Sequence, residues 1–280
     1  MSTAARPALR NQIEAALAFH SAGRHQEALD TLTTPSENLP DFYTLRGDIQ
    51  FALARYEEAA GSYFTSATLE PPPQNAYAQF RLGICLHHLG RWAEAGQAFQ
   101  RVLEMDPHRD EVRLGLGACL LHLNRPEEAL ANFDHCWSDA ARLRVLFGKA
   151  VALQLLGRHH EAEGAYQRLL AADPNSEEAL SNLIALCMEA HDLENARRYA
   201  TRLAELDPES QAALQGLAAV ALENREYEAA FRYCSRIVER SPECVEAWHN
   251  LRFASGRIMS TLRPPAAAAA ASTAIGAGRK

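Results

Sequence analysis

Apolar residues recur along the chain three or four positions apart, and short polar turns separate these stretches. In RLGICLHHLG, Leu82, Leu86 and Leu89 fall on one face of a helix. In the next stretch, AEAGQAFQRVLEM, Ala95 and Phe99 begin a second apolar face with the same spacing. The pattern predicts an all-α chain built from pairs of helices, which we name helix A and helix B.

A short motif marks the start of each predicted helix B. It reads GRHQEA at 23–28, GRWAEA at 90–95 and NRPEEA at 124–129. One alanine of the motif recurs seven times, mostly at intervals of 33 or 34 residues: Ala28, Ala59, Ala95, Ala129, Ala162, Ala196 and Ala230. Prolines follow with the same period, at Pro71, Pro107, Pro174, Pro208 and Pro242. Because proline cannot continue a helix, these residues should end helix B.

A helix pair that repeats about every 34 residues resembles the tetratricopeptide repeat (TPR) family. The resemblance covers about residues 9–262 and implies a right-handed superhelical solenoid of about seven repeats. The expected parts are an N-terminal extension at 1–8, repeats near 9–39, 40–73, 76–109, 110–142, 143–176, 177–210 and 211–244, a capping helix at 245–262, and a disordered Pro/Ala-rich tail at 263–280.

Small residues should stand where helices A and B touch. On helix A these are Gly47, Gly83, Gly117 and Ala150, and on helix B they are the motif alanines. A larger side chain at such a contact costs about 1–3 kcal/mol through overpacking. Aromatic residues at the next core position of helix B should pack between repeats: Tyr63, Phe99, Phe133 and Tyr166.

Two repeats depart from the pattern. The second helix of the first repeat is broken by Pro35, and an atypical terminal repeat is expected of a capping unit. The fourth repeat lacks its closing proline. Its helix B is expected to end near Trp137, with Ser138 or Asp139 capping the next helix.

Residues 157–174, GRHHEAEGAYQRLLAADP, contain side chains of the types that bind zinc. The repeat explains them without a metal. His159 stands where Tyr56 and Trp92 stand in other repeats, and we expect it to be partly buried. His160 and Glu161 fall in the solvated first turn of helix B, where a negative charge suits the helix dipole. No metal ion or other cofactor is therefore predicted.

Composition and charge exclude several classes of protein. Hydrophobic residues make up 48% and charged residues 22%, with a net charge of −7, which is an ordinary globular balance. The acidic balance argues against nucleic-acid binding, including binding of RNA by helical repeats. Six cysteines without a C-x-x-C pair favour a reducing compartment. The sequence has neither a signal-peptide core nor an apolar run that would insert into a membrane, so a cytoplasmic location is expected.

In TPR proteins the A helices line a concave groove that often binds peptides, and the resemblance assigns groove positions here by phase. The candidates are Tyr77, Phe80, Arg81, Ile84, His87, His88, Leu114, Ala118, Leu121, His122, Arg144, Phe147, Val151 and Gln154. Packing of Phe80 and Phe147 into neighbouring helices is the alternative. The three histidines raise the question of a metal site across adjacent repeats, and ordinary surface histidines are the favoured interpretation.

Some family members bind acidic peptide C-termini through a clamp of Lys, Arg and Asn. The corresponding places here hold mainly Leu17, Leu45, Leu114, Gly115 and Phe147, so a clamp is not expected. Only Arg81 and Asn182 match the clamp in chemical type.

The leading functional hypothesis is a non-catalytic scaffold or adaptor, cytoplasmic and bacterial, that binds a protein or peptide of unidentified sequence. The alternative is a substrate-recruiting TPR part of a larger enzyme or of a secretion or assembly complex. An intrinsic enzyme is disfavoured because the chain has no Gly-rich phosphate loop, no HExxH motif and no nucleophile elbow. Formation of a homo-oligomer through the groove or the first repeat is left open.

Overall fold

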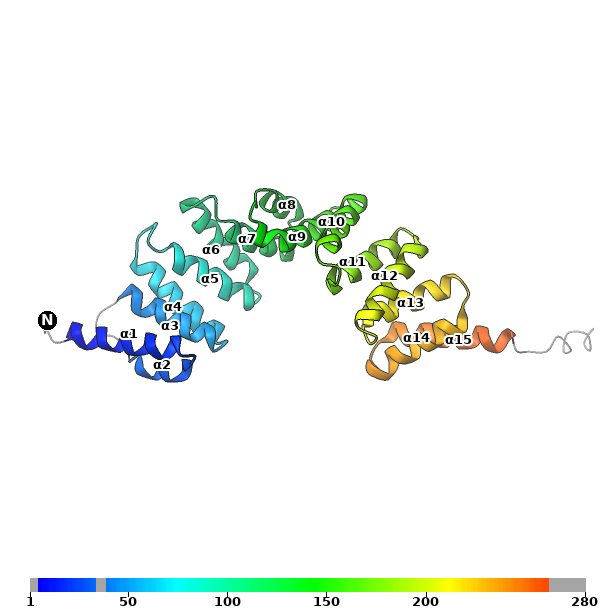
Figure 1. Ribbon diagram of the computed structural model, residues 1–280, viewed down its shortest axis with the longest axis horizontal. Coiled ribbons are helices and arrows are strands. Elements are labelled where there is room, and N and C mark those ends of the chain that lie inside the picture. Colours follow the sequence, from blue (N-terminus) through cyan, green and yellow to red (C-terminus); the bar gives the residue numbers. More distant parts are fainter. Residues whose placement is uncertain (1–4, 34–38, 262–280) are drawn as a thin grey trace, which may run out of the picture. The chain divides into compact units, whose positions relative to one another are not determined.

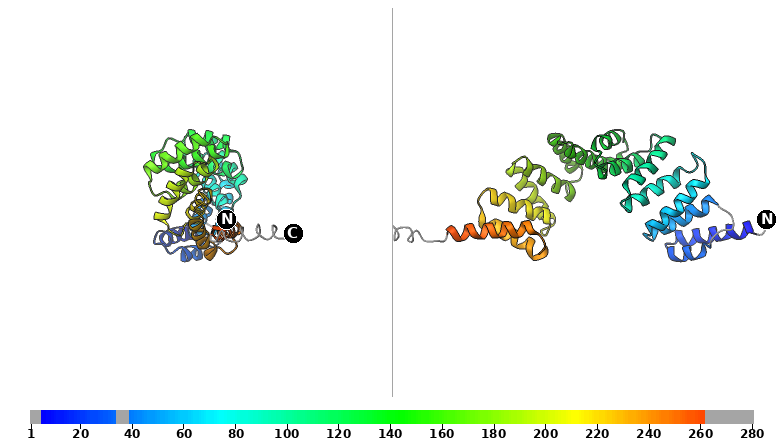
Figure 2. Two further views of the ribbon diagram at one scale, coloured as in Figure 1. Left: turned by 90° about the vertical axis from the view of Figure 1, so that its right-hand side faces the viewer. Right: turned by 180° about the vertical axis from the view of Figure 1, so that it is seen from behind.

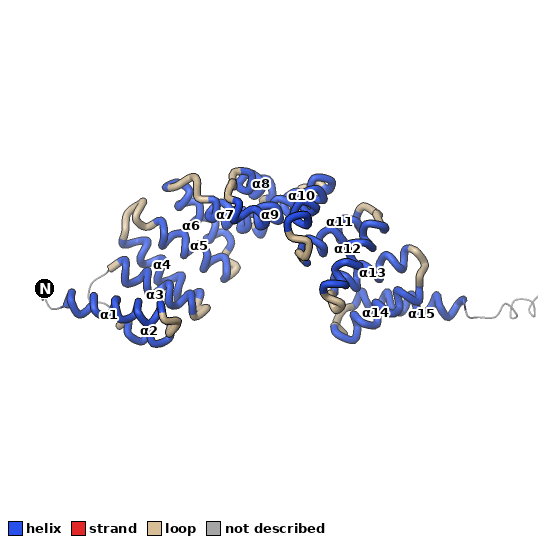
Figure 3. The backbone as a smooth tube through the Cα atoms, in the orientation of Figure 1, coloured by secondary structure: helices blue, strands red, loops and turns tan. Residues whose placement is uncertain are grey.

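The fold was analysed on a computed structural model, which describes residues 5–33 and 39–261. The expected breaks at Pro35 and in the tail at 263–280 lie outside the described residues. Within the described ranges all regular structure is helical, and short loops join the helices (Figure 3). The chain divides into two compact units, 1–165 and 166–280, and the boundary falls inside helix α10, His159–Ala172. Each unit is considered separately.

The first unit contains helices that follow one another in chain order (Figure 1). They are α1 Ala5–Ser21, α2 His25–Thr31, α3 Pro40–Ala52, α4 Tyr56–Leu69, α5 Ala76–His88, α6 Trp92–Met105, α7 Asp110–His122, α8 Pro126–Asp134, the 3₁₀ turn η1 Asp139–Ala141, and α9 Arg142–Leu155. Helix α1 begins four residues before the expected start of the first repeat, and α2 is short, as its sequence predicts.

The second unit holds the remaining helix pairs and one further helix. They are α11 Glu177–Glu189, α12 Leu193–Leu206, α13 Gln211–Glu223, α14 Tyr227–Arg240 and α15 Val245–Thr261. Each helix packs on the next one in the chain, from α11 to α15. Helix α15 coincides with the segment expected after the last repeat.

Most consecutive A helices within each unit pack directly on one another. These contacts join α1 to α3, α5 to α7 and α7 to α9 in the first unit, and α11 to α13 and α13 to α15 in the second. Consecutive B helices within the described ranges make no comparable contacts. The right-hand view of Figure 2, seen from behind, also shows the helices of the first unit, coloured blue to green, side by side in chain order. The A helices therefore form the more closely packed side of each unit.

Glycine permits the close approach of helices A and B that the sequence predicts. A Cβ atom on Gly83 would lie 2.6 Å from the ring of Phe99, and one on Gly117 would lie 2.5 Å from the ring of Phe133. The recurring alanines of helix B have no exposed surface. The aromatic rings also reach the following repeat, because a Cβ atom on Gly148 of α9 would lie 2.5 Å from Phe133. The predicted packing between repeats is confirmed here.

Every A helix followed by a B helix ends with one residue in the left-handed region. These residues are Gly23, Ala54, Gly90, Asn124, Gly157, His191 and Arg225, with φ between 55° and 75°. The next N–H then bonds back to a carbonyl of the last helical turn, as Arg91 N–H does to Leu86 O at 2.9 Å. This is the Schellman type of helix ending, which reverses the chain within a few residues. Each A–B turn is thus fixed by the backbone.

The fourth repeat differs from its predicted form. Helix α8 ends at Asp134, three residues before the expected end near Trp137. Neither Ser138 nor Asp139 caps a helix through its side chain. Instead, Asp110 of α7 accepts the N–H of Trp137 at 2.8 Å and that of Ser138 at 2.5 Å. These bonds provide an acceptor for two N–H groups that would be bonded within a longer helix. The prediction that Ser138 or Asp139 caps the next helix is wrong, because neither side chain forms a cap.

Candidate functional site

The groove candidates all lie on α5, α7 and α9, and none of them is fully buried. Each A helix has an opposite face that forms the core, for example Leu82 and Leu86 on α5 and Leu116 and Leu120 on α7. The phase inferred from the sequence therefore separates the buried from the accessible positions on these three helices. We call the accessible side of α5, α7 and α9 the A face.

The apolar members of the A face are half-buried. Phe80, Ile84, Leu114 and Leu121 all pack against the core cluster of the first unit. The ring of Phe80 lies 6.1 Å from that of Phe99, and the guanidinium of Arg109 lies 5.2 Å above it. Phe80 thus serves the packing of neighbouring helices while keeping part of its surface accessible. Ala118, Phe147, Val151 and Gln154 are also half-buried, and Arg144 is exposed.

A polar cluster supports one end of the A face. Asp48 of α3 accepts hydrogen bonds from Tyr63 of α4 at 2.6 Å and from Tyr77 of α5 at 2.9 Å. Burial, followed by the bond to Asp48, raises the pKa of Tyr77 to about 12, and the same causes raise the pKa of Tyr63. Both phenols therefore stay neutral donors, and the cluster ties three helices together.

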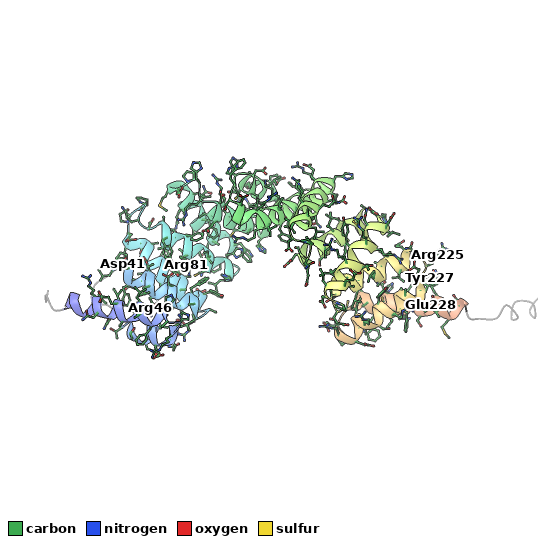
Figure 4. All side chains as sticks on the ribbon, viewed as in Figure 1. Asp41, Arg46, Arg81, Arg225, Tyr227 and Glu228 are labelled. Atoms are coloured by element: carbon green, nitrogen blue, oxygen red, sulfur yellow. The ribbon has the colours of Figure 1, made fainter. Side chains whose placement is uncertain are left out.

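Arg81 belongs to this cluster. Its Nε donates to the Tyr63 hydroxyl at 3.0 Å and lies 3.4 Å from Asp48 Oδ1. Its guanidinium also stacks over the ring of Phe51 at 4.2 Å, and Figure 4 labels it on α5. Arg81 is thus held within the chain. Asp48 and Phe51 were missed from the sequence because each lies in the preceding repeat, and their contact to α5 depends on how the repeats stack.

Three histidines form a second feature of the A face, which we call the histidine row: His87, His88 and His122. The His88 ring stacks on Tyr56 at a centroid distance of 4.4 Å and an interplanar angle of 4°. The His122 ring stacks on Trp92 at 3.9 Å and 8°. The His87 ring lies between them, and its centroid is 6.4 Å from that of His88 and 6.0 Å from that of His122. Its centroid is 4.7 Å from that of Trp92, with the two rings edge to face.

The row repeats one contact in two neighbouring repeats. Each stacked histidine is the last residue of an A helix, and each supporting ring is the first residue of the preceding helix B. The sequence offered a usable signal, since Tyr56 and Trp92 occupy the same repeat position. Within the described residues, no group of three or more His, Cys, Asp or Glu side chains is arranged to hold a metal ion.

One expectation about a single residue is corrected. His159 is exposed, not partly buried, whereas Glu161 accepts two hydrogen bonds from Arg158, at 2.6 and 2.7 Å. Leu45, placed by phase at a clamp position, is 8% exposed and packs in the core cluster with α1 and α2.

Comparison with protein-family models matches most of the described chain to tetratricopeptide repeats. Three such models match residues 44–110, residues 88–135 and 188–252, and residues 144–176. Together they span more than half of the chain. Comparison with curated proteins gave no match. No helix in the described ranges combines the length and the apolar content that crossing a membrane requires.

Solved structures share the fold at low sequence identity. The C-terminal part of a TPR repeat-containing protein from Cytophaga hutchinsonii has a TM-score of 0.66 and 17% identity, over 85% of this chain and 99% of that one. A TPR protein from Parabacteroides merdae scores 0.65 at 17% identity, over 89% and 99%. PilW, described as a type IV pilus biogenesis factor, scores 0.65 at 22% identity, over 78% and 99%. With the helix pairs, the glycine contacts and the family models in agreement, the chain belongs to the tetratricopeptide repeat family.

Proposed function

We propose that this protein is a non-catalytic scaffold or adaptor, and that the A face of its first unit binds a peptide or helix of a protein partner. The observation that carries the proposal is the set of half-buried apolar side chains on adjacent A helices. Ile84, Leu114 and Leu121 are anchored in the core and keep accessible surface. Such anchored apolar side chains suit a partner's apolar anchor residue, because little side-chain entropy is lost on binding.

The polar surroundings support a directional ligand. Tyr77 is 46% exposed, and its hydroxyl is fixed by Asp48. Arg144, on α9, is exposed at the other end of the face. An ordered phenol at one end and a cation at the other would orient an extended or helical segment across the three helices. Side chains fixed before binding give specificity at low entropic cost.

Affinity capture from a lysate of the source cells tests the proposal with matched variants. The A-face variant carries Tyr77→Ala and Arg144→Ala. The control carries Phe64→Ala and Arg101→Ala, which remove the same kinds of side chain from exposed positions on B helices α4 and α6. A partner held by wild type and by the control, but bound about tenfold or more weakly by the A-face variant, is the expected result.

Equal retention by both variants would contradict the assignment to the A face. Circular dichroism of all three proteins checks that the helices are intact.

The alternative, a substrate-recruiting part of a larger enzyme or of a secretion or assembly complex, is distinguished by the identity of the captured partner. An enzyme or a membrane-complex subunit would favour it, and an isolated regulatory protein would favour the adaptor. Location in the cytoplasm and assembly into homo-oligomers stay predictions.

A further inference from the structure

The turn between α8 and α9 exposes two large apolar side chains. Trp137 is 82% exposed, more than any other large apolar side chain in the described ranges, and Leu143 is 42% exposed. The turns after α6, α10 and α12 read DPHR, DPNS and DPES, without a large apolar residue. Tryptophan is among the residue types that most often carry the binding energy of a protein interface. This turn is therefore a candidate contact surface.

Hydrogen bonds on both sides of Trp137 fix the backbone that presents it. The Asp110 carboxylate accepts the N–H of Trp137 at 2.8 Å and that of Ser138 at 2.5 Å. The preceding residue, Cys136, donates its thiol to the Asp110 carbonyl at 3.6 Å. The η1 turn that follows packs against both α7 and α9. Because this backbone is ordered before any contact is made, a partner that covers the indole loses little of its binding energy to ordering the loop.

Two opposite charges lie beside the apolar side chains. Asp139 is the first residue of η1, and Arg142 is the first residue of α9. Both are exposed, and neither forms an ion pair with another described residue. We call this surface the loop patch, and its members are Trp137, Asp139, Arg142 and Leu143. The patch thus contains an apolar part, an acid and a base within seven residues.

The combination of charges favours one kind of partner. The exposed carboxylate of Asp139 disfavours a lipid surface, because membranes that attract basic segments are themselves anionic. A second copy of the chain brings both matching charges to the patch. In a two-fold contact the same patch faces itself, so that each acid meets the base of the other copy. The loop patch meets this condition with Asp139 and Arg142.

We propose that the loop patch joins two copies of this chain about a two-fold axis. In this dimer Asp139 of each copy lies opposite Arg142 of the second copy, and Trp137 packs against Leu143 of the second copy. The contact lies outside the A-face candidates and goes beyond the proposed function. A patch of four side chains is small beside the roughly 20–30 residues per side of a standard interface, so the dissociation constant should be on the order of 10–100 µM.

Analytical ultracentrifugation of the full chain, between about 1 and 500 µM, tests the proposal. We expect a monomer at the lowest concentration and a dimer at the highest. Trp137→Ser should raise the dissociation constant about tenfold or more. The matched control is Phe64→Ser, which removes another exposed aromatic ring, on α4, and should leave the dissociation constant unchanged. Circular dichroism checks that each variant keeps its helices.

An exchange of charges identifies the two residues that meet. Asp139→Arg and Arg142→Asp each place like charges opposite one another, and each variant alone should dimerise at least about tenfold more weakly. An equal mixture of the two should form a heterodimer with an affinity within about threefold of wild type, because every acid again meets an arginine. Arg144→Asp changes an exposed arginine outside the patch and should dimerise as wild type does.

Three results would overturn the proposal. They are a wild-type chain that stays monomeric over the whole range, a dimer that Trp137→Ser leaves unchanged, and single charge variants that stay monomeric when mixed. The capture test of the A face changes neither Trp137 nor Arg142, so the two proposals fail independently.

Discussion

At the scale of single residues, glycine sets how closely helices A and B approach. The Cβ that Gly83→Ala adds would lie 2.6 Å from the Phe99 ring, and Phe99 is 2% exposed and cannot retreat. We expect the variant to lose about 1–3 kcal/mol of unfolding free energy in urea denaturation. The control is Gly61→Ala in α4, where a Cβ would meet nothing within 4 Å. It should be neutral or stabilising by up to about 1 kcal/mol. Equal losses in both variants would contradict the packing argument.

The left-handed residue after each A helix gives a second prediction. Ala54 adopts φ 57° where Gly90 and Gly157 stand in other repeats. An L side chain in this region destabilises the folded chain by about 1–2 kcal/mol. Glycine removes this strain, but it also raises the conformational entropy of the unfolded chain, which offsets part of the stabilisation. Ala54→Gly should therefore raise the unfolding free energy by up to about 1 kcal/mol. Gly90→Ala should lower it by a similar amount. Thermal melts of both variants beside wild type measure the pair, and a loss of stability in Ala54→Gly would refute the strain.

Residue types and their period predicted the repeat, but the partners of some residues depended on stacking. Gly83 was predicted as a contact glycine because it recurs in phase. Gly115 was not, although a Cβ on it would lie 2.9 Å from the Phe99 ring of the preceding repeat. Asp48 likewise bonds Tyr77, 29 residues ahead. Contacts within a helix pair follow from one repeat's sequence, whereas contacts between repeats depend on the angle at which repeats pack.

At the scale of elements, helix α8 ends earlier than the repeat period predicts, and the Asp110 side chain accepts hydrogen bonds from the backbone that follows it. Counting from the motif alanine, Trp137 corresponds to Leu103 of α6. Leu103 is 8% exposed, whereas Trp137 is 82% exposed. The phase alone therefore predicts a buried residue at 137. The sequence does not show that Asp110 holds the N–H groups of residues 137 and 138, because its partners lie 27 and 28 positions away.

Removal of this carboxylate tests its role. Asp110→Ala leaves the N–H groups of Trp137 and Ser138 without their acceptor, and should cost about 1–3 kcal/mol of unfolding free energy. Glu111→Ala is the matched control, since Glu111 is the next residue of α7 and is exposed. Guanidinium denaturation compares the two, and hydrogen exchange at residues 137 and 138 should accelerate in the Asp110 variant alone. Unchanged exchange there would show that the two bonds do not hold the loop.

At the scale of the whole molecule, the chain has a net charge of −7 and contains 11 histidines. Protonation of histidines in mild acid therefore brings the net charge closer to zero. Two of these histidines oppose protonation in the folded state. Burial and the nearness of His25 lower the pKa of His20, whose Nδ1 lies 3.0 Å from that of His25. Burial and two neighbouring histidines lower the pKa of His87. The unfolded chain therefore binds more protons than the folded chain as the pH falls below the ordinary histidine pKa of about 6.5.

The sign of the pH dependence follows from this difference in bound protons. The contribution of both histidines to stability is complete above about pH 7 and is lost as the pH falls through the range between their unfolded and folded pKa values. Urea denaturation at pH 7.5 and 5.5 should show a smaller loss of unfolding free energy in His20→Asn with His87→Asn than in wild type. His108→Asn with His160→Asn, at exposed positions, controls for histidine number and should lose as much as wild type. If the His20→Asn/His87→Asn variant loses as much unfolding free energy in acid as wild type does, folding does not lower the pKa values of these two histidines.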